Sequence, residues 1–235
     1  MPIINKNKAK YVQRFLLKWY EKNKRELPWR NIKSNNKTNA YYVLVSEFML
    51  QQTTVNTVTK RFNEFIKLWP SIDKLSRISE NRILRFWSGL GYYNRATNLL
   101  KTIKIISRDF KSKVPQHYDQ LIELPGVGDY TAKAILGIAY NQPVLPLDAN
   151  IKRIIARLYG IKTSLLLNKK TIEDIASKYQ SSNKASDLIQ SFMDYGSVIC
   201  LPRNPKCDEC LIEKFCEARK KNIQHLIPFK NLSLE

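Results

Sequence analysis

Apolar residues recur at three- and four-residue spacing along nearly the whole chain, which is the period of an amphipathic helix. The only candidate strand is 143–147, and its two prolines indicate an extended connector instead. We therefore predict an all-α fold. The predicted helices cover residues 9–22, 40–58, 59–68, 79–88, 92–109, 117–123, 130–140, 149–158, 171–179 and 184–198. The predicted breaks are 31–39, 111–115, 124–128 and 162–169.

The composition supports a folded protein away from membranes. Apolar residues make up 43% of the 235 positions, which is enough to form a core and excludes disorder as the main state. No apolar run approaches the roughly 20 residues of a membrane span, and the first residues lack the apolar centre of a signal peptide. We expect a soluble protein without a membrane partner, cytoplasmic and nucleoid-associated in a bacterium or nuclear in a eukaryote.

The charge points to a polyanionic partner. Forty Lys and Arg residues face 20 Asp and Glu residues, a net charge of +20. Each basic side chain that neutralises a phosphate releases a condensed counterion, so nucleic acid is the first partner to consider. The alternative is a solvated surface whose Lys- and Asn-rich composition reflects an AT-rich genome. Charge alone does not separate these interpretations.

All four cysteines lie within 17 residues and have the spacing C-x6-C-x2-C-x5-C. They are Cys200, Cys207, Cys210 and Cys216. Clustered thiols in a chain without secretory features indicate one metal centre rather than disulfides. Only one pair has the short spacing of a zinc knuckle, so the pattern favours a four-iron cluster over zinc, which remains the alternative. Arg203, Lys206 and Lys214 are expected to place positive charge around the thiolates.

The stretch 121–132 predicts two helices joined by a tight hairpin. Gly126 and Gly128 both allow positive φ and the close approach of another backbone. The second helix would then present its N-terminal N–H groups to a phosphate. An ordinary turn between two packed helices is the structural alternative.

Two carboxylates are expected in contrasting surroundings. Asp148 stands where an extended segment enters a helix, and N-capping hydrogen bonds would keep it ionised. Glu47 is expected on an apolar stripe of one helix, with Gln51 four residues and Val55 eight residues further on. Desolvation there would raise the pKa of Glu47 and suit it as a general acid. The alternative for Glu47 is an ion pair with a basic residue. One acid and one anion are what glycosidic bond cleavage requires.

The motifs resemble those of helix-hairpin-helix DNA glycosylases of the endonuclease III superfamily, and most closely the MutY-type adenine DNA glycosylases. They cover almost the entire chain in the family's order. The matching segments are 19–20, 27–30, 46–53, 87–96, 124–128, 148–150 and the cysteine spacing. The chain ends at Glu235, about where the family's Nudix-like domain would begin, so we expect a short form without that domain.

The resemblance implies a role for each matched position. Glu47 would protonate the adenine, Asp148 and Asn150 would stabilise the cationic sugar, and Tyr130 would lie against the reacting nucleotide. Arg30, Val55 and Gln190 would line the base pocket. Gln51, Gln52, Tyr92, Gly126, Gly128 and Lys152 would contact DNA. The four cysteines would bind one 4Fe-4S cluster.

The resemblance also implies the reaction. We expect a monomer that binds duplex DNA with a mismatched or damaged pair and removes adenine opposite 8-oxoguanine or guanine. Bifunctional relatives carry Lys at the position of Tyr130, so we expect a monofunctional enzyme, with Lys133 as the source of any weak lyase activity. The alternatives are a thymine or uracil mismatch glycosylase and a non-catalytic DNA-binding protein.

The same resemblance implies two helical lobes. A six-helix barrel domain containing the hairpin would span 31–140. The cluster domain would combine 1–30 with 141–220, and 221–235 would form a C-terminal tail.

Overall fold

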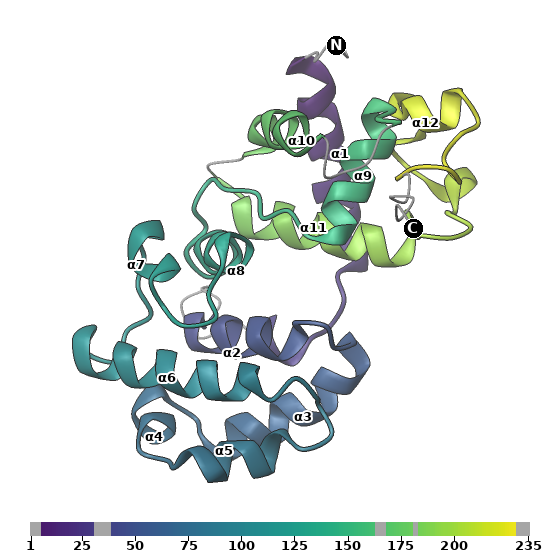
Figure 1. Ribbon diagram of the computed structural model, residues 1–235. Coiled ribbons are helices and arrows are strands. Elements are labelled where there is room, and N and C mark those ends of the chain that lie inside the picture. Colours follow the sequence, from purple (N-terminus) through teal and green to yellow (C-terminus); the bar gives the residue numbers. More distant parts are fainter. Residues whose placement is uncertain (1–5, 31–38, 163–167, 181–182, 229–235) are drawn as a thin grey trace, which may run out of the picture. The chain divides into compact units, whose positions relative to one another are not determined.

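The computed structural model describes residues 6–30, 39–162, 168–180 and 183–228. Within these ranges the regular structure is helical and no strand occurs, so the prediction of an all-α fold is confirmed (Figure 1). The longer elements are α1 (Lys6–Asn23), α2 (Ala40–Leu50), α3 (Val55–Leu68), α5 (Glu80–Trp87), α6 (Asn94–Asp109), α9 (Ala149–Tyr159), α10 (Lys169–Ala176) and α11 (Ala185–Val198). The shorter ones are η1 (Pro28–Arg30), α4 (Ile72–Ser76), α7 (Tyr118–Ile122), α8 (Asp129–Ala134), the π-helical η2 (Ile135–Ala139), and η3 (Ser177–Tyr179), η4 (Cys207–Glu209), η5 (Glu213–Phe215) and α12 (Glu217–Lys220).

The prediction of one helix over 40–58 is wrong. Helix α2 ends at Leu50, Gln52 has a φ of 55°, and α3 begins at Val55. The hydroxyl of Thr54 caps α3 by accepting a hydrogen bond from the Thr57 N–H at 3.4 Å. A capping threonine and a left-handed residue break the helix although the apolar period continues across the break. Glu47 and Val55 therefore do not share a helical stripe.

Other element boundaries follow local backbone signals. The sequence pattern missed α4, which begins where the Ser71 hydroxyl accepts a hydrogen bond from the Lys74 N–H at 3.3 Å. Helix α6 begins at Asn94 rather than 92 because Tyr92 has a φ of 48°. The stretch 143–147 is an extended connector without strand pairing, as predicted. Most of the expected breaks 31–39 and 162–169, and residues 229–235 of the expected tail 221–235, lie outside the described residues.

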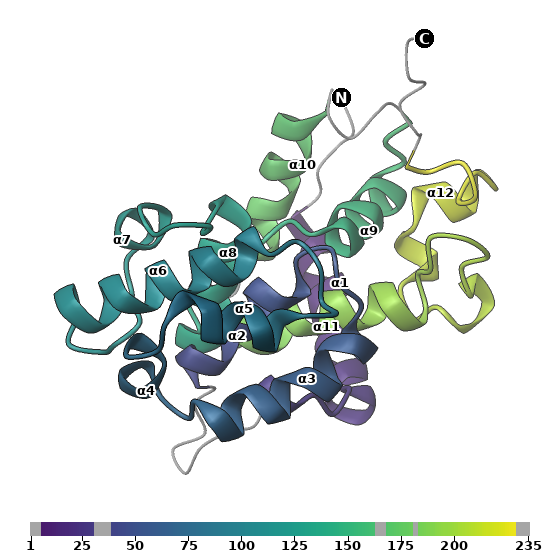
Figure 2. The same ribbon diagram turned by 60° about the horizontal axis from the view of Figure 1, so that its bottom comes forward.

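The chain divides into two compact units, residues 26–140 and residues 1–25 with 141–235. In the first unit α2 packs against α3, α6, α8 and η2, while α4 and α5 pack on α6 (Figures 1 and 2). Its core is rich in aromatic side chains. These are Phe48, Phe62, Phe65, Trp69 and Trp87. The domain bounds expected from the family stay a prediction.

The second unit is built around α11. Helix α1 packs along α11, and α9 packs against α11, α10 and α12. Asp194 of α11 is fully buried and accepts hydrogen bonds from the Arg25 backbone N–H at 3.0 Å and from its Nε at 2.7 Å. This ion pair attaches the segment just after α1 to helix α11.

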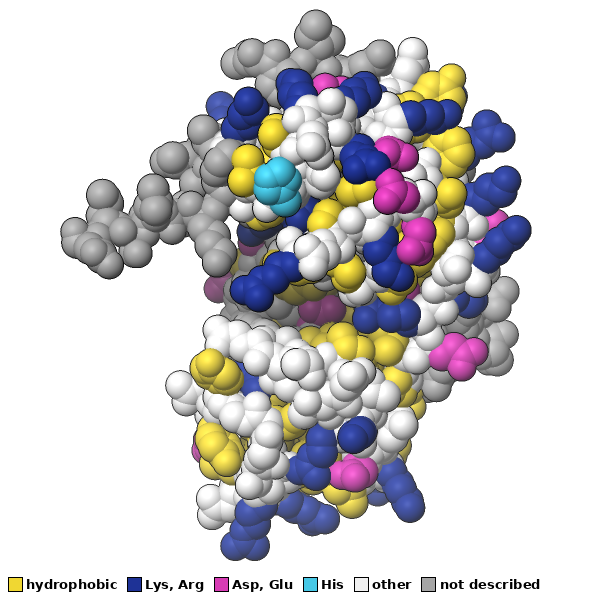
Figure 3. Space-filling model, turned by 90° about the vertical axis from the view of Figure 1, so that its right-hand side faces the viewer, with side chains coloured by type: hydrophobic (Ala, Val, Ile, Leu, Met, Phe, Trp, Pro, Cys, Tyr) yellow, Lys and Arg dark blue, Asp and Glu magenta, His cyan; other side chains and the backbone are white. Residues whose placement is uncertain are grey.

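The surface is strongly charged. Figure 3 shows Lys and Arg side chains spread over one face, with Asp and Glu side chains among them in its upper part. Among the described residues no helix has both the length and the apolar character needed to cross a membrane.

Candidate functional site

Asp148 is the N-cap of α9, as predicted. Its Oδ1 accepts a hydrogen bond from the Ile151 N–H at 2.6 Å, and its Oδ2 accepts one from the Asn150 side chain at 3.2 Å. Both contacts are local because Asp148 and Asn150 lie on either side of the first helical residue. The sequence Asp-Ala-Asn therefore fixes the orientation of the carboxylate without help from distant residues.

Burial, rather than the expected hydrogen bonds, has the largest effect on the pKa of Asp148. Burial raises the pKa of the Asp148 carboxyl, and this effect outweighs the opposing hydrogen bonds from Ile151 and Asn150 and the charge of Arg153. The hydrogen bonds are present, but the desolvation of the charged carboxylate costs more free energy than these hydrogen bonds contribute. Asp148 is thus protonated at a higher pH than an ordinary aspartate.

A network that the sequence did not reveal holds Asn150. Arg153 donates to Asn150 Oδ1 at 2.8 Å, to the Gly196 carbonyl at 2.7 Å and to the Cys200 carbonyl at 2.9 Å. A Cβ on Gly196 would lie 2.6 Å from the Asn150 Cβ, so only glycine fits there. A glycine inside a helix is the sequence signal that could have indicated this close approach.

Glu47 belongs to α2, in the other unit. Its side chain lies in a helix that is buried on most sides, and only 6% of the residue is exposed. Helix α2 packs against η2, a π-helical stretch that directly follows α8. Such stretches are frequent at functional sites. The raised pKa expected for Glu47 stays a prediction.

The hairpin between α7 and α8 has the predicted form, but its glycines differ in role. Gly126 has a φ of 79° and packs closely, because an added Cβ would lie 2.8 Å from the Phe48 ring. Gly128 has an ordinary φ of −94°, and an added Cβ would meet nothing within 4 Å. Gly128 therefore does not use the positive φ that glycine allows. Its open surroundings leave room for another backbone to approach.

Helix α8 carries two of the candidate residues. Tyr130 is its second residue and is half-buried. Lys133 forms an ion pair with Asp129 across one helical turn, with 2.7 Å between Nζ and Oδ1. The ion pair engages the amine that we named as the source of any weak lyase activity.

Three residues expected to contact DNA lie together. Gln51, Gln52 and Tyr92 line one surface pocket with Tyr93, Asn94 and Arg95. Tyr92 is 63% exposed although it is aromatic. The Gln51 side chain also donates to the Gly126 carbonyl at 3.4 Å, which links this pocket to the hairpin. The sequence did not single out Arg95.

The remaining candidates lie on separate elements. Arg30 ends η1 and Val55 begins α3, and both are half-buried in unit 26–140. Lys152 is half-buried on α9. Gln190 on α11 is buried, with 6% of the residue exposed. Its Nε2 donates to the Ser186 carbonyl at 3.2 Å, and its Oε1 is buried without a hydrogen-bond partner in the described chain.

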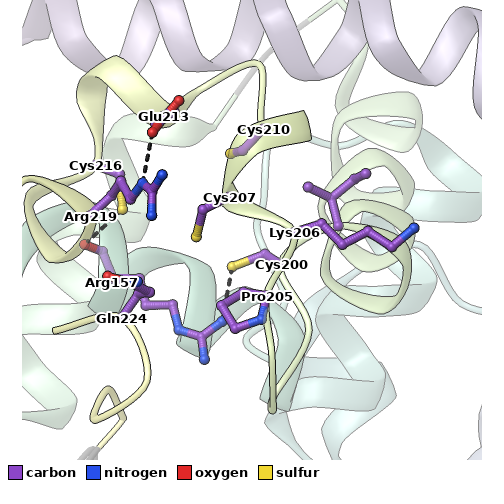
Figure 4. A pocket seen from close by; sticks show the side chains of 11 residues that line it. Arg157, Cys200, Pro205, Lys206, Cys207, Cys210, Glu213, Cys216, Arg219 and Gln224 are labelled. Carbon is purple, nitrogen blue, oxygen red and sulfur yellow. Dashed lines mark hydrogen bonds and ion pairs between the residues drawn. The ribbon is translucent and has the colours of Figure 1, made fainter. Parts of the chain in front are cut away.

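The four cysteines surround one cavity. It holds about 320 Å³ of empty space, counting the part open to solvent, and the thiols point toward this space from three loop segments and the end of α11 (Figure 4). Cys207 begins η4, Cys210 follows it, and Cys216 joins η5 to α12. Within the described ranges no three His, Cys, Asp or Glu side chains lie close enough together to hold a single metal ion.

Side chains that the sequence did not indicate surround the thiols. Arg157 donates to Cys200 Sγ at 3.4 Å and Tyr195 donates to Cys210 Sγ at 3.3 Å. Arg219 pairs with Glu213 at 2.7 Å and with Asp208 at 2.6 Å, which ties the loops together. Of the three basic residues expected here, only Lys206 lines the cavity, whereas Lys214 lies over the Phe15 and Phe215 rings.

The thiols of Cys207, Cys210 and Cys216 are hard to deprotonate in these surroundings. Burial raises the pKa of Cys207 and Cys216, and it raises the pKa of Cys210 to about 11. A metal ligand must be a thiolate, so the positive charge that stabilises it has to come from the bound group as well as from Arg157. Four thiols that line one cavity, but do not lie close enough together for a single metal ion, are compatible with a larger metal cluster.

Comparison with known proteins shows the family to which the chain belongs. The family model for the HhH-GPD superfamily base excision DNA repair protein matches residues 45–181. A protein of Buchnera aphidicola subsp. Baizongia pistaciae named adenine DNA glycosylase is 41% identical, over 91% of this chain and 62% of its own length. The human protein of that name is 34% identical, over 88% of this chain and 39% of its own length. The chain thus spans about three fifths or less of these relatives.

Solved structures show the same fold. A thermostable thymine-DNA glycosylase superposes with a TM-score of 0.81 at 27% identity, over 92% of this chain and 98% of its own. An endonuclease III in a complex with DNA gives a TM-score of 0.74 at 22% identity, over 94% of this chain and all of its own. The chain belongs to the HhH-GPD superfamily of base excision DNA repair proteins.

Proposed function

We propose that this chain is a monofunctional adenine DNA glycosylase that hydrolyses the N-glycosidic bond of adenine mispaired with 8-oxoguanine or guanine. The observation that carries the proposal is the Asp148 carboxylate, fixed at the start of α9 by Ile151 and by an Asn150 that Arg153 holds in turn. A fixed anion stabilises the positive charge that develops on the sugar as the base leaves. The relatives named adenine DNA glycosylase support the choice of base.

The two carboxylates have different tasks in the proposed reaction. Glu47 donates a proton to the purine ring of an extruded adenine, which makes the base a better leaving group. Asp148 stays anionic beside the sugar and stabilises its oxocarbenium-like state. Glu47 then accepts a proton from the attacking water. Tyr130 lies against the nucleotide in this scheme, and the strand remains uncut because this tyrosine stands where bifunctional relatives carry a nucleophilic lysine.

The choice of adenine has a structural argument in Gln190. Its Nε2 is bound to Ser186, which leaves the buried Oε1 as an acceptor that needs a donor. The exocyclic amino group of adenine is such a donor. The N3–H of thymine is another, and the thymine-DNA glycosylase of similar fold keeps that alternative open to test.

The base specificity is tested with duplexes that each carry one A·8-oxoguanine, A·G, T·G or U·G pair. We expect strand cleavage after alkali on the two adenine duplexes only, and no cleavage without alkali. Cleavage of T·G or U·G instead would assign the base to the pyrimidine alternative. Cleavage of none of them, with binding retained, would indicate a non-catalytic DNA-binding protein.

We further propose that the cysteines hold one 4Fe-4S cluster. Cys200, Cys207, Cys210 and Cys216 would each ligate one iron, and the bound group would supply a rigid, positively charged centre that orders the loop 200–216. Arg157 would contribute charge beside Cys200, while the Arg219 pairs with Glu213 and Asp208 hold the loop closed. The reaction itself uses none of these residues.

Metal analysis of the purified protein tests this assignment. We expect about four iron atoms per chain and broad visible absorption, and we expect Cys210→Ser to lose both. Ser197→Ala, which removes a hydroxyl bound to the Met193 carbonyl at 3.1 Å, is the control that should keep them. One zinc ion per chain without colour would contradict the cluster.

A further inference from the structure

Arg95, in the first turn of α6, is a buried cation at the centre of the pocket that holds Gln51, Gln52 and Tyr92. Only 6% of the residue is exposed, although arginines of a DNA-binding chain commonly face phosphate. Its guanidinium instead donates to six backbone carbonyls. These are Phe48 at 3.3 Å, Met49 at 2.7 Å, Gln51 at 2.5 Å, Leu90 at 2.8 Å, Gly91 at 2.9 Å and Tyr92 at 3.4 Å.

The six carbonyls belong to two segments that are distant in sequence. Three lie at the C-terminal end of α2, where the last carbonyls of a helix lack donors within the helix and a positive charge is favourable. The other three lie in the loop 90–92 that precedes α6. The five N–H groups of the guanidinium lie in its plane and point outward in different directions, so one side chain can join the two segments.

Each segment contains a strained residue next to a carbonyl that Arg95 binds. Gln52 has a φ of 55° and Tyr92 has a φ of 48°, and neither is glycine. A left-handed conformation costs such residues roughly 1–2 kcal/mol. Both side chains are exposed, so their own packing does not offset this cost. The hydrogen bonds from Arg95 to the Gln51 and Tyr92 carbonyls lie directly at these two positions, where they can offset the cost.

We propose that Arg95 is a positioning residue that locks the segments 51–52 and 90–92 into one preformed surface for the duplex. This inference rests on the proposed function, because it assigns the surface to mispaired DNA. Arg95 acts through Gln51, Gln52 and Tyr92 and does not itself bind phosphate. Locking these side chains before DNA arrives reduces the ordering cost of binding, and so strengthens the recognition of a mispair.

The first test is hydrogen exchange of the protein without DNA. The Thr53 N–H, bound to the Leu50 carbonyl, reports on one segment, and the Leu90 N–H, bound to the Trp87 carbonyl, reports on the other. We expect Arg95→Met to accelerate exchange of both amides at least about tenfold, with a smaller increase in Arg95→Lys, whose ammonium donates from a single point. Arg82→Met, which alters an exposed arginine of α5, should change neither.

Faster exchange of only one of the two amides in Arg95→Met, or of neither, would overturn the lock. If the amides of Arg95→Met exchange faster throughout the chain, the fold itself is lost. The Arg95→Lys variant then decides whether Arg95 locks the two segments. In that variant a joint increase confined to the two segments supports the lock, and a change in one segment alone overturns it.

The second test is DNA affinity as a function of salt. The preference is the ratio of the affinity for the A·8-oxoguanine duplex to the affinity for the fully paired duplex. We expect Arg95→Met to reduce this ratio about tenfold, while the slope of log Kd against log salt stays unchanged. A phosphate contact would lower the slope by about 0.9, and that result would overturn the positioning role. If the parent protein shows no preference for the mispair, the proposed function fails, while the exchange result still decides whether Arg95 locks the two segments.

Discussion

Asp148→Asn is expected to slow adenine release by at least about 100-fold while leaving duplex binding nearly unchanged. Asparagine has the same shape and can accept the hydrogen bond from the Ile151 N–H, so α9 keeps its cap. What it lacks is the negative charge that stabilises the cationic sugar. Single-turnover kinetics and equilibrium binding to the A·8-oxoguanine duplex measure the two effects separately.

The matched control is Asp174→Asn, which removes an exposed carboxylate from α10 in the same unit. It should leave both the rate and the affinity unchanged. If Asp148→Asn weakens binding as much as it slows release, Asp148 serves the structure of α9 rather than the reaction.

The same substitution is expected to change stability in a pH-dependent way. Because burial raises the pKa of Asp148 in the folded protein, its contribution to stability is fully present below the pKa of the unfolded chain. That contribution is lost as the pH rises through the folded-state pKa. Asp148→Asn should therefore gain in Tm relative to the parent protein as the pH rises above about 4, the pKa of aspartate in an unfolded chain, and a gain of about 1 kcal/mol corresponds to about 2–4 °C. A relative loss of Tm over that range would contradict the raised pKa.

Glu47→Gln is expected to slow adenine release by about 10²- to 10⁴-fold, the usual contribution of a general acid. The amide fills the same space in α2 but cannot protonate the base. Since only 6% of Glu47 is exposed, the Tm is also followed, to separate the loss of a proton donor from a change in the fold. The rate, the affinity for the A·8-oxoguanine duplex and the Tm are measured together.

Glu64→Gln is the control for Glu47. Glu64 is an exposed residue of α3 that pairs with Arg61 at 3.1 Å, so its loss should change none of the three quantities by much. A Glu47→Gln variant that releases adenine at the parent rate would remove Glu47 from the mechanism. A variant with a strongly lowered Tm would show that the carboxylate is part of a structural ion pair.

Features with local causes were predictable from the sequence. The all-α class follows from the apolar period, and the cap at Asp148 follows from an acidic residue between an extended connector and a helix. The spacing of the four cysteines was enough to bring them to one cavity. In each case the relevant contacts lie within a few residues, or within one short loop, along the chain.

Features that depend on distant segments were not predictable. The partners of Arg95 lie up to 47 residues away, and the two distant partners of Arg153 lie 43 and 47 residues away. In a chain with 40 basic residues, nothing in the local pattern marks these two as buried. The break at 51–54 was missed because the apolar period of α2 continues in phase with α3. Burial of Asp148 likewise depends on its folded surroundings rather than on its cap.

The most direct measurement is the free base that the protein releases. The parent protein is incubated in excess over a duplex with one A·8-oxoguanine pair, and the small molecules are separated by chromatography. The account predicts stoichiometric free adenine and an intact strand, with almost none from Glu47→Gln or Asp148→Asn in the same time. Absence of free adenine while the parent protein binds this duplex, or release at the parent rate by both variants, would contradict it.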